Sequence, residues 1–111
     1  MEKELQGALI LDSIVFDEIN FKRFGFKNDN ELKLSFGAEI KKLDNSDDNY
    51  VTTIQISGDK KNEYTFIVKL SGYFIINGSD FSDHEKRKLL DSNSVAILMP
   101  YLRSQISTLT A

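Results

Sequence analysis

The chain has 111 residues, the size of one domain, and 41% of them are apolar, which is enough for a single hydrophobic core. Its 14 basic and 17 acidic residues give a net charge of −3, and the densest basic run is only Lys86–Lys88, which disfavours nucleic acid because phosphate neutralisation needs clustered Lys and Arg. The absence of cysteine excludes disulfides, thiolate zinc sites, iron–sulfur clusters and cysteine nucleophiles, and it fits a reducing compartment. Because the sequence shows neither a basic-then-apolar leader nor an apolar run of membrane length, we expect one cytoplasmic domain over residues 1–111, without a membrane partner.

The first predicted strand runs from Ile14 to Phe21 and changes parity within its length. Ile14 and Phe16 share one parity, whereas Ile19 and Phe21 share the other. A one-residue slip of this kind is what a β-bulge produces, so we expect a bulged strand followed by a turn-rich segment at 24–30.

Three further segments alternate apolar and polar residues and are predicted to be strands, at 32–40, 50–56 and 64–70. An acidic loop at 43–49 separates the first two, and a turn sequence at 58–62 separates the last two. That second connection is too short for a parallel crossover, so the strands on either side of it should form an antiparallel hairpin. One face of these strands is apolar and the other mostly polar, which indicates a sheet covered on one side.

The chain becomes helical in pattern after Gly78. Ser82 begins a capping box that predicts a short helix, and the polar residues 91–94 are expected to cap a second, longer one. An apolar stripe at three- and four-residue steps supports the second helix; it consists of Val95, Leu98, Met99, Leu102, Ile106 and Leu109. Pro100 falls inside this stripe, so the helix either begins or bends there. Strands followed by helices make an α+β layer arrangement.

Groups that could carry catalysis are scarce. His84 lies in a charged helix start, which favours a solvated surface role over a catalytic one. The acidic loop at 43–49 could bind calcium, but it lacks the oxygen spacing and closing glutamate of an EF-hand, so a solvated loop is the preferred interpretation. Asp17 and Glu18 are adjacent in a predicted strand and should face opposite sides of the sheet. No phosphate-binding glycine loop or nucleophile elbow is present, so we expect no enzyme, metal or cofactor.

Aromatic residues are more numerous than one thin core needs, with eight Phe and four Tyr. Phe21, Phe24 and Phe26 lie near a turn, and the consecutive run Tyr73–Ile76 must place apolar side chains on both faces of the sheet. One interpretation is that a helix covers one face and an oligomer partner covers the other. The other is a hydrophobic groove for extended peptides, and the two are compatible.

The end of the chain resembles a known helix signature. Residues 93–103 read Asn-Ser-Val-Ala-Ile-Leu-Met-Pro-Tyr-Leu-Arg and are followed by Ile106–Thr110. This segment resembles the signature of the SecB protein-export chaperones, which is an Asn-Ile-Leu-Phe-Pro-Tyr-Ala-Arg-like run and then a Ser-rich apolar helix. Phe66–Ile76 is similar to that family's fourth strand with its Gly-aromatic exit, and Ile14–Phe21 is similar to its first strand. The resemblance spans about residues 10 to 110.

This resemblance implies a fold, an assembly and a site. The fold would be α+β, a four-stranded antiparallel sheet with C-terminal helices packed on one side. SecB-like proteins form tetramers as dimers of dimers and hold unfolded polypeptides in hydrophobic grooves without nucleotide or metal, which implies a homo-oligomer, dimer or tetramer, without a cofactor. The implied client-binding groove draws on the end of the first strand, on the fourth strand and on the helix, at Phe21, Phe24, Phe26, Phe74, Ile76, Leu98, Met99 and Leu102.

Two departures from the family bear on the partner. Export chaperones dock the basic tail of the SecA motor on acidic residues of the sheet; Glu18 matches one such position, but Lys22 and Lys69 stand where others are acidic. Like charge there opposes a basic partner, which favours a dedicated client, as in toxin–antitoxin systems, over general export. The family also continues with a Pro-rich segment and another helix, whereas this sequence stops at Ala111, so we expect a shortened chain or a minimal member with a more open groove.

The leading hypothesis is therefore an ATP-independent chaperone for unfolded or partly folded polypeptides, with an antitoxin or the export machinery as a further partner. The alternative is a non-catalytic adaptor of the same fold that binds one specific folded partner. An enzyme ranks third.

Overall fold

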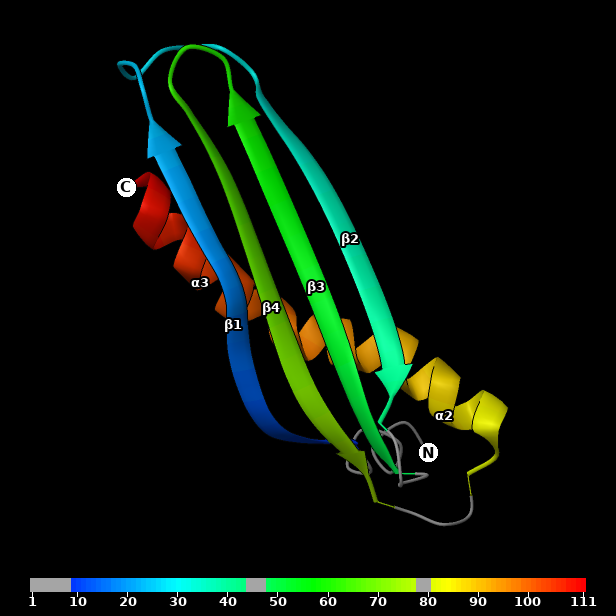
Figure 1. Cartoon of the computed structure of the whole chain (residues 1–111). Coiled ribbons are helices and arrows are strands. Elements are labelled where there is room, and N and C mark those ends of the chain that lie inside the picture. The colour runs from blue at the N-terminus through cyan, green and yellow to red at the C-terminus, as the bar shows by residue number, and fades with distance from the viewer. Residues whose placement is uncertain (1–8, 44–47, 78–80) are drawn as a thin grey trace.

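The structure, a computed structural model, describes residues 9–43, 48–77 and 81–111, and within them four strands precede a helical region (Figure 1). The strands are β1 (Leu9–Arg23), β2 (Leu32–Lys42), β3 (Asn49–Lys60) and β4 (Tyr64–Ile76). The helical region consists of α2 (Asp83–Leu89), a π-helical segment (Leu90–Ser94) and α3 (Val95–Thr110).

The strands form one antiparallel sheet in the order β1-β4-β3-β2, so that β1 and β2 are its two edges. In Figure 1 the helical region runs obliquely behind the sheet, with the C-terminus on the β1 side and α2 near the end where β2 finishes. We call the side that carries the helices the helix face, and the opposite side the outer face. This arrangement confirms the predicted fold class, a four-stranded antiparallel sheet with C-terminal helices on one side.

β1 contains two bulges. Its register with β4 shifts between Leu11 and Ser13 and again between Phe16 and Glu18. The second shift is the bulge that the sequence predicts. Each one-residue slip moves the side chains that follow it to the opposite face of the sheet. The apolar side chains before, between and after the two bulges therefore all lie on the helix face, although their parity in the sequence changes. These side chains are Leu9, Leu11, Ile14, Phe16, Ile19 and Phe21.

β3 and β4 form the predicted hairpin, with Lys60 paired to Tyr64. Asn62 in the turn has a φ of 63°, in the left-handed region that Asn tolerates better than most residues with a side chain. The Glu63 N–H donates to the Lys60 carbonyl at 3.0 Å and closes the turn. The turn lies at the end of the sheet opposite α2 (Figure 1).

The core lies between the helix face and the helical region, and α3 approaches β4 closely at Gly72. A Cβ on Gly72 would stand 2.5 Å from Leu98 Cδ2, so the missing side chain permits this approach. Thr52, which pairs with Gly72, donates its hydroxyl to Ser94 Oγ at 2.8 Å, and Ser94 donates in turn to the Leu90 carbonyl. Both hydroxyls are fully buried, and the hydrogen bonds that hold the π-helical segment over β3 offset the cost of their desolvation.

The first helix is capped as predicted, whereas the second begins at Val95 without the predicted cap. Ser82 Oγ accepts from the Glu85 N–H at 3.2 Å while Glu85 Oε1 accepts from the Ser82 N–H at 3.0 Å, which confirms the capping box. The prediction that residues 91–94 cap a second helix is wrong, because they form the π-helical segment with helical backbone at Ser94. The Ser94 hydroxyl bonds to Thr52 and Leu90 instead of to a helix N-terminus.

Pro100 lies inside α3, so the helix does not begin there. Proline has no N–H for the carbonyl of Ala96, four residues earlier. Both residues are exposed, so water can bond to that carbonyl in place of the missing donor.

Candidate functional site

The helix face is only partly covered. α3 packs against β4 and β3, whereas the first half of β2 extends beyond it. There Leu32, Leu34 and Phe36 lie on the helix face, because they pair with Lys60, Gly58 and Ile56 of β3, and all three are exposed, Leu34 by 58% and Phe36 by 50%. We call these three residues the β2 apolar strip. A row of exposed large apolar side chains of this kind is typical of a surface that binds a partner.

β2 is also an accessible edge. Every residue of the strand except Ile40 is exposed, and its register with β3 runs without a shift. In the part of the chain that the structure describes, no strand pairs with its outer edge. Unpaired backbone donors and acceptors therefore run beside the β2 apolar strip, which is an arrangement that accepts an extended polypeptide.

The segment that precedes β2, residues 24–31, presents two further phenylalanines. Phe24 is 53% exposed and Phe26 is 93% exposed. This segment, which we call the rim loop, leads directly into Leu32, so its aromatic rings and the β2 apolar strip follow one another along the chain. Together they contain five of the ten large apolar side chains that are exposed in the described residues.

A nearly buried carboxylate anchors the rim loop. The Glu63 side chain, only 6% exposed, lies in the β3–β4 turn and accepts from Lys60 Nζ at 2.9 Å, from the Asn28 N–H at 3.0 Å and from Arg23 Nη1 at 3.3 Å. The hydrogen bond from Lys60 is the main reason that the pKa of Glu63 lies below its ordinary value of 4.5. Desolvation opposes this shift, and the bonds from Asn28 and Arg23 add to it.

The structure divides the predicted groove residues into three groups. Phe24 and Phe26 are exposed, and Phe21 and Met99 are half-buried. Phe74, Ile76, Leu98 and Leu102 are fully buried in the core of their own chain. In the single chain these last four are therefore core residues and not part of an exposed surface.

The sequence did not single out Leu32, Leu34 and Phe36 as site residues. Their alternation predicts the strand correctly, but an alternating apolar side is normally the buried side. Their exposure follows from the position of β2 at the edge of the sheet, beyond the reach of α3. The sequence signal that could have found them is that no predicted helix was left to cover a fourth strand.

The three predicted partner-docking residues, Glu18, Lys22 and Lys69, share the outer face. Glu18 pairs with Lys69 across β1 and β4, so the acidic and the basic position stand opposite each other. Asp17 lies on the same face, since it accepts from Ser71 Oγ. The expectation that Asp17 and Glu18 face opposite sides is therefore wrong, because the bulge between Phe16 and Glu18 inserts an extra residue at this point.

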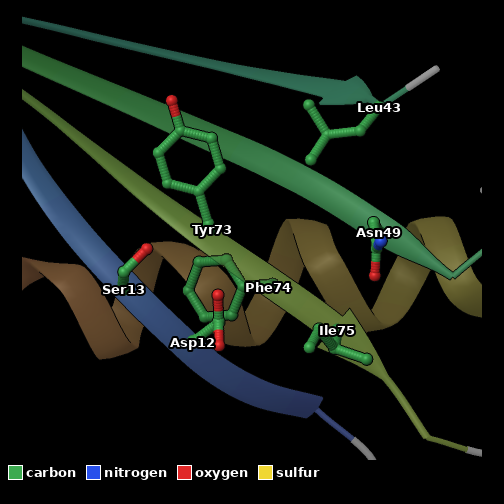
Figure 2. Close-up of a pocket in the computed structure, with 7 residues that line it drawn as sticks. All are labelled: Asp12, Ser13, Leu43, Asn49, Tyr73, Phe74 and Ile75. Atoms are coloured by element: carbon green, nitrogen blue, oxygen red, sulfur yellow. The ribbon is translucent and has the colours of Figure 1, made fainter.

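The outer face also has a shallow pocket of about 240 Å³ at the α2 end of the sheet (Figure 2). Tyr73 and Ile75 of β4 point into it, as the consecutive apolar run predicts, and the other lining residues are Asp12, Ser13, Leu43, Asn49 and Phe74. One carboxylate among apolar and neutral groups is no catalytic arrangement. Across residues 9–43, 48–77 and 81–111, no three His, Asp or Glu residues gather in a metal-binding group.

Two further predictions from the sequence concern His84 and the acidic loop. His84 is exposed on α2, as expected for a solvated residue. The acidic loop lies largely outside the described residues, at 44–47, so its two interpretations stay open. None of the helices in the described ranges is long and apolar enough to span a bilayer.

Comparison with known proteins shows the fold. No family model matches the sequence. A curated relative, the uncharacterized protein MJ0357 of Methanocaldococcus jannaschii, is 31% identical over 85 aligned residues. The match covers 72% of this chain and 54% of the relative, so the chain spans about half the length of the curated relative it matches. Among solved structures, the SecB-like chaperone Rv1957 of Mycobacterium tuberculosis, in complex with a ChAD peptide from the HigA1 antitoxin Rv1956, superimposes with a TM-score of 0.74. The superposition covers 97% of this chain and 82% of that one at 14% identity, so the chain has a SecB-like fold.

Proposed function

We propose that this protein is an ATP-independent cytoplasmic chaperone that binds an extended, unfolded segment of a dedicated client. The segment lies along the β2 apolar strip and contacts Phe24 and Phe26 of the rim loop. The observation that carries the proposal is the row of exposed apolar side chains beside a free strand edge. The apolar side chains supply affinity for unfolded chains, and the strand edge supplies backbone hydrogen bonds that do not depend on the client's sequence.

The likeness of fold supports this proposal, because the similar structure of Rv1957 was solved with an antitoxin peptide. A dedicated client, such as an antitoxin, fits the outer face better than the export machinery does. Lys69 places positive charge opposite Glu18, and Lys22 adds positive charge farther along the same face, which weakens the attraction for a basic docking tail. Apolar helix-face surface that the client does not cover is available for assembly into a dimer or tetramer.

The test is suppression of aggregation, followed by light scattering, when a guanidinium-unfolded protein is diluted into buffer without ATP. The wild-type chain should suppress scattering at a small molar excess. The double variant Leu34→Ser with Phe36→Ser should bind the unfolded client about 30-fold more weakly, because loss of two apolar anchor residues at about 1 kcal/mol each costs about 2 kcal/mol in total. Both side chains are exposed, so the fold should persist, and circular dichroism checks this.

The matched control is Val15→Ser, which removes a side chain of similar exposure, 46%, from the outer face. It should leave client binding unchanged. Equal loss of binding in the control and in the double variant, or no effect of the wild-type chain on aggregation at tenfold excess, would contradict the proposal.

The second candidate function is an adaptor for one folded partner, favoured by the apolar side chains on the outer face. Ile10, Val15 and Ile75 are exposed there, beside the pocket at Tyr73. An adaptor that used this face would lose its partner in Val15→Ser and keep it in the β2 double variant, which is the opposite of the chaperone result.

A further inference from the structure

The rim loop is held to the β3–β4 turn by bonds from both its ends. The N–H groups of Phe24 and Gly25 both donate to the Glu63 carbonyl, at 3.0 and 3.2 Å. Farther along, Asn28 Nδ2 donates to the Lys61 carbonyl at 3.1 Å, and Lys60 Nζ donates to the Asn28 carbonyl at 2.6 Å. Two segments that are more than thirty residues apart in the sequence thus form one hydrogen-bonded unit.

The approach between the two segments is close enough to restrict the residue type. A Cβ on Gly25 would stand 1.7 Å from the Asn62 carbonyl oxygen, so no side chain fits there without moving the backbone. On the other side of the turn, the Arg23 guanidinium that bonds Glu63 lies over the rings of Phe21 and Tyr64, 5.6 and 5.5 Å from their centroids. Arg23 therefore links the carboxylate to the aromatic cluster of the helix face.

These contacts explain how two phenylalanines stay in water. An exposed aromatic ring on a free loop gains by folding back onto nearby apolar surface, since burial of apolar area is favourable. Phe26 remains 93% exposed because the backbone on both sides of it is fixed to the hairpin turn. A loop that is already ordered also loses less conformational freedom when it binds, which raises affinity.

We propose that Glu63 is a positioning residue for client binding: its carboxylate holds the rim loop on the β3–β4 turn and so keeps Phe24 and Phe26 exposed at the end of the sheet where β2 begins. What the loop binds rests on the function proposed above, whereas the anchoring of the loop stands on the geometry alone. The charged groups that face the carboxylate in the described residues are Arg23 of β1 and Lys60 of β3, and the loop itself contributes the Asn28 N–H.

The chain has no tryptophan, so Phe26→Trp introduces a single fluorescent reporter into the rim loop and keeps an aromatic side chain there. In this background Glu63→Gln removes the negative charge at almost unchanged volume. We expect the tryptophan anisotropy to fall and its quenching by acrylamide to rise. The matched control is Glu31→Gln, which removes an exposed carboxylate from the same loop and should change neither quantity.

A pH titration separates anchoring by the carboxylate from a general structural effect. Because the pKa of Glu63 is lowered, the parent should keep high anisotropy down to about pH 4.5 and lose it as the pH falls further. In Glu63→Gln the anisotropy should already be low and should stay flat over this range. A parent and a Glu63→Gln variant with the same anisotropy and the same acid response would overturn the proposal.

Client binding is measured on the same proteins with a fluorescently labelled, permanently unfolded polypeptide at neutral pH. Glu63→Gln should bind about tenfold more weakly than the parent, because two side chains must then be immobilised on binding. Glu31→Gln should bind like the parent. A parent that binds no client overturns the proposed function, whereas equal binding by the parent and Glu63→Gln overturns the positioning role.

A second variant loosens the rim loop at other bonds if Glu63→Gln does not fold, because the Asn28 N–H that bonds to Glu63 remains in it. Asn28→Ala removes the amide bonds to the Lys61 and Phe26 carbonyls, and that amide lies at the surface. It should lower anisotropy and client affinity in the same direction as Glu63→Gln. Unchanged values in Asn28→Ala would contradict an ordered loop as the source of affinity.

Discussion

At the residue scale, single polar contacts determine the geometry of this chain. The pair of Thr52 and Ser94 fixes the π-helical segment over β3, and Glu63 fixes the rim loop to the hairpin turn. Each contact joins a residue of the β3–β4 hairpin to a segment that is distant in the sequence. These buried polar side chains therefore fix the positions of the π-helical segment and the rim loop relative to the hairpin.

The Thr52–Ser94 pair leads to an asymmetric prediction. Thr52→Val removes one hydrogen bond but leaves Ser94 bonded to the Leu90 carbonyl, so the free energy of unfolding should fall by about 1 kcal/mol. Ser94→Ala leaves the buried Thr52 hydroxyl without its acceptor and should cost about 1–3 kcal/mol. In urea unfolding followed by circular dichroism, the double variant should lose less than the sum of the two single losses. Additive losses would show that the two hydroxyls do not interact.

Two carboxylates predict the acid dependence of stability. The pKa values of Glu63 and Glu85 are both lowered, the first mainly by the hydrogen bond from Lys60 and the second mainly by the bond from the Ser82 N–H. A carboxyl group with a lowered folded-state pKa stabilises the fold above its unfolded value of about 4.5, and this contribution disappears as the pH falls through the folded value.

The urea midpoint of the wild-type chain should therefore decline between about pH 5 and pH 3. Glu63→Gln and Glu85→Gln should each make this decline shallower, and their effects should add, because the two groups lie on different elements and share no partner. Glu31→Gln is the control and should reproduce the wild-type slope. Identical slopes in all four proteins would contradict both assignments.

At the element scale, the feature that defines the site is how α3 lies on the sheet. The helix packs against β4 and β3, through Leu98 and Leu102, and leaves the first half of β2 uncovered. Gly72 permits the close approach, since any side chain at that position would force the Leu98 side chain or α3 itself to shift. The exposure of the β2 apolar strip is thus a consequence of where the helix is seated.

A pair of glycine substitutions tests this seating. Gly72→Ala should lower the free energy of unfolding by about 1–3 kcal/mol, because the added methyl overpacks the contact with Leu98 and Phe74. Gly37→Ala in β2 is the matched control, since a Cβ there meets no atom within 4 Å. It should be neutral or slightly stabilising, by up to about 1 kcal/mol, because alanine is less flexible in a strand. Thermal unfolding that gave equal shifts for both variants would contradict the close packing of α3 on Gly72.

At the scale of the whole molecule, the chain is long and thin. Its principal extents are 54 × 28 × 19 Å, and its radius of gyration of 16.7 Å exceeds the value of about 13 Å that a compact chain of this length would have. A flat two-layer body buries less of its apolar surface than a compact one, which agrees with the exposed apolar side chains on both faces, among them Phe36, Ile19, Val15 and Tyr101.

This shape predicts self-association. Light scattering behind a sizing column should give a mass that is a multiple of the 12.7 kDa of one chain, and addition of an unfolded client should shift the client into the same peak. A monomer that takes up the client would support the proposed binding site and contradict the predicted self-association. A monomer that ignores the client would favour the adaptor.

The sequence alone determined most of the local structure. Alternation with period two predicts the strands, the change of parity after Phe16 predicts a bulge, the short turn after Gly58 predicts the hairpin, and Ser82 with Glu85 predicts the capping box. All of these are interactions between residues that are close in the sequence, so their signals lie in short windows. The same windows place the start of the second helix correctly, at Val95, but wrongly assign a cap to residues 91–94, where Ser94 makes a tertiary hydrogen bond instead.

Only the tertiary structure decided which residues form the site. The strand order β1-β4-β3-β2 places β2 at an edge and β4 in the middle, so an identical alternating pattern is exposed in one strand and buried in the other. Phe74 and Ile76 of β4, with Leu98 and Leu102 of α3 packed over the sheet, are core residues, and Leu32, Leu34 and Phe36 are surface residues, although both sets consist of large apolar side chains. Burial and the carboxylate bonds of Glu63 depend on which distant segments meet, and a pattern within one segment does not contain that information.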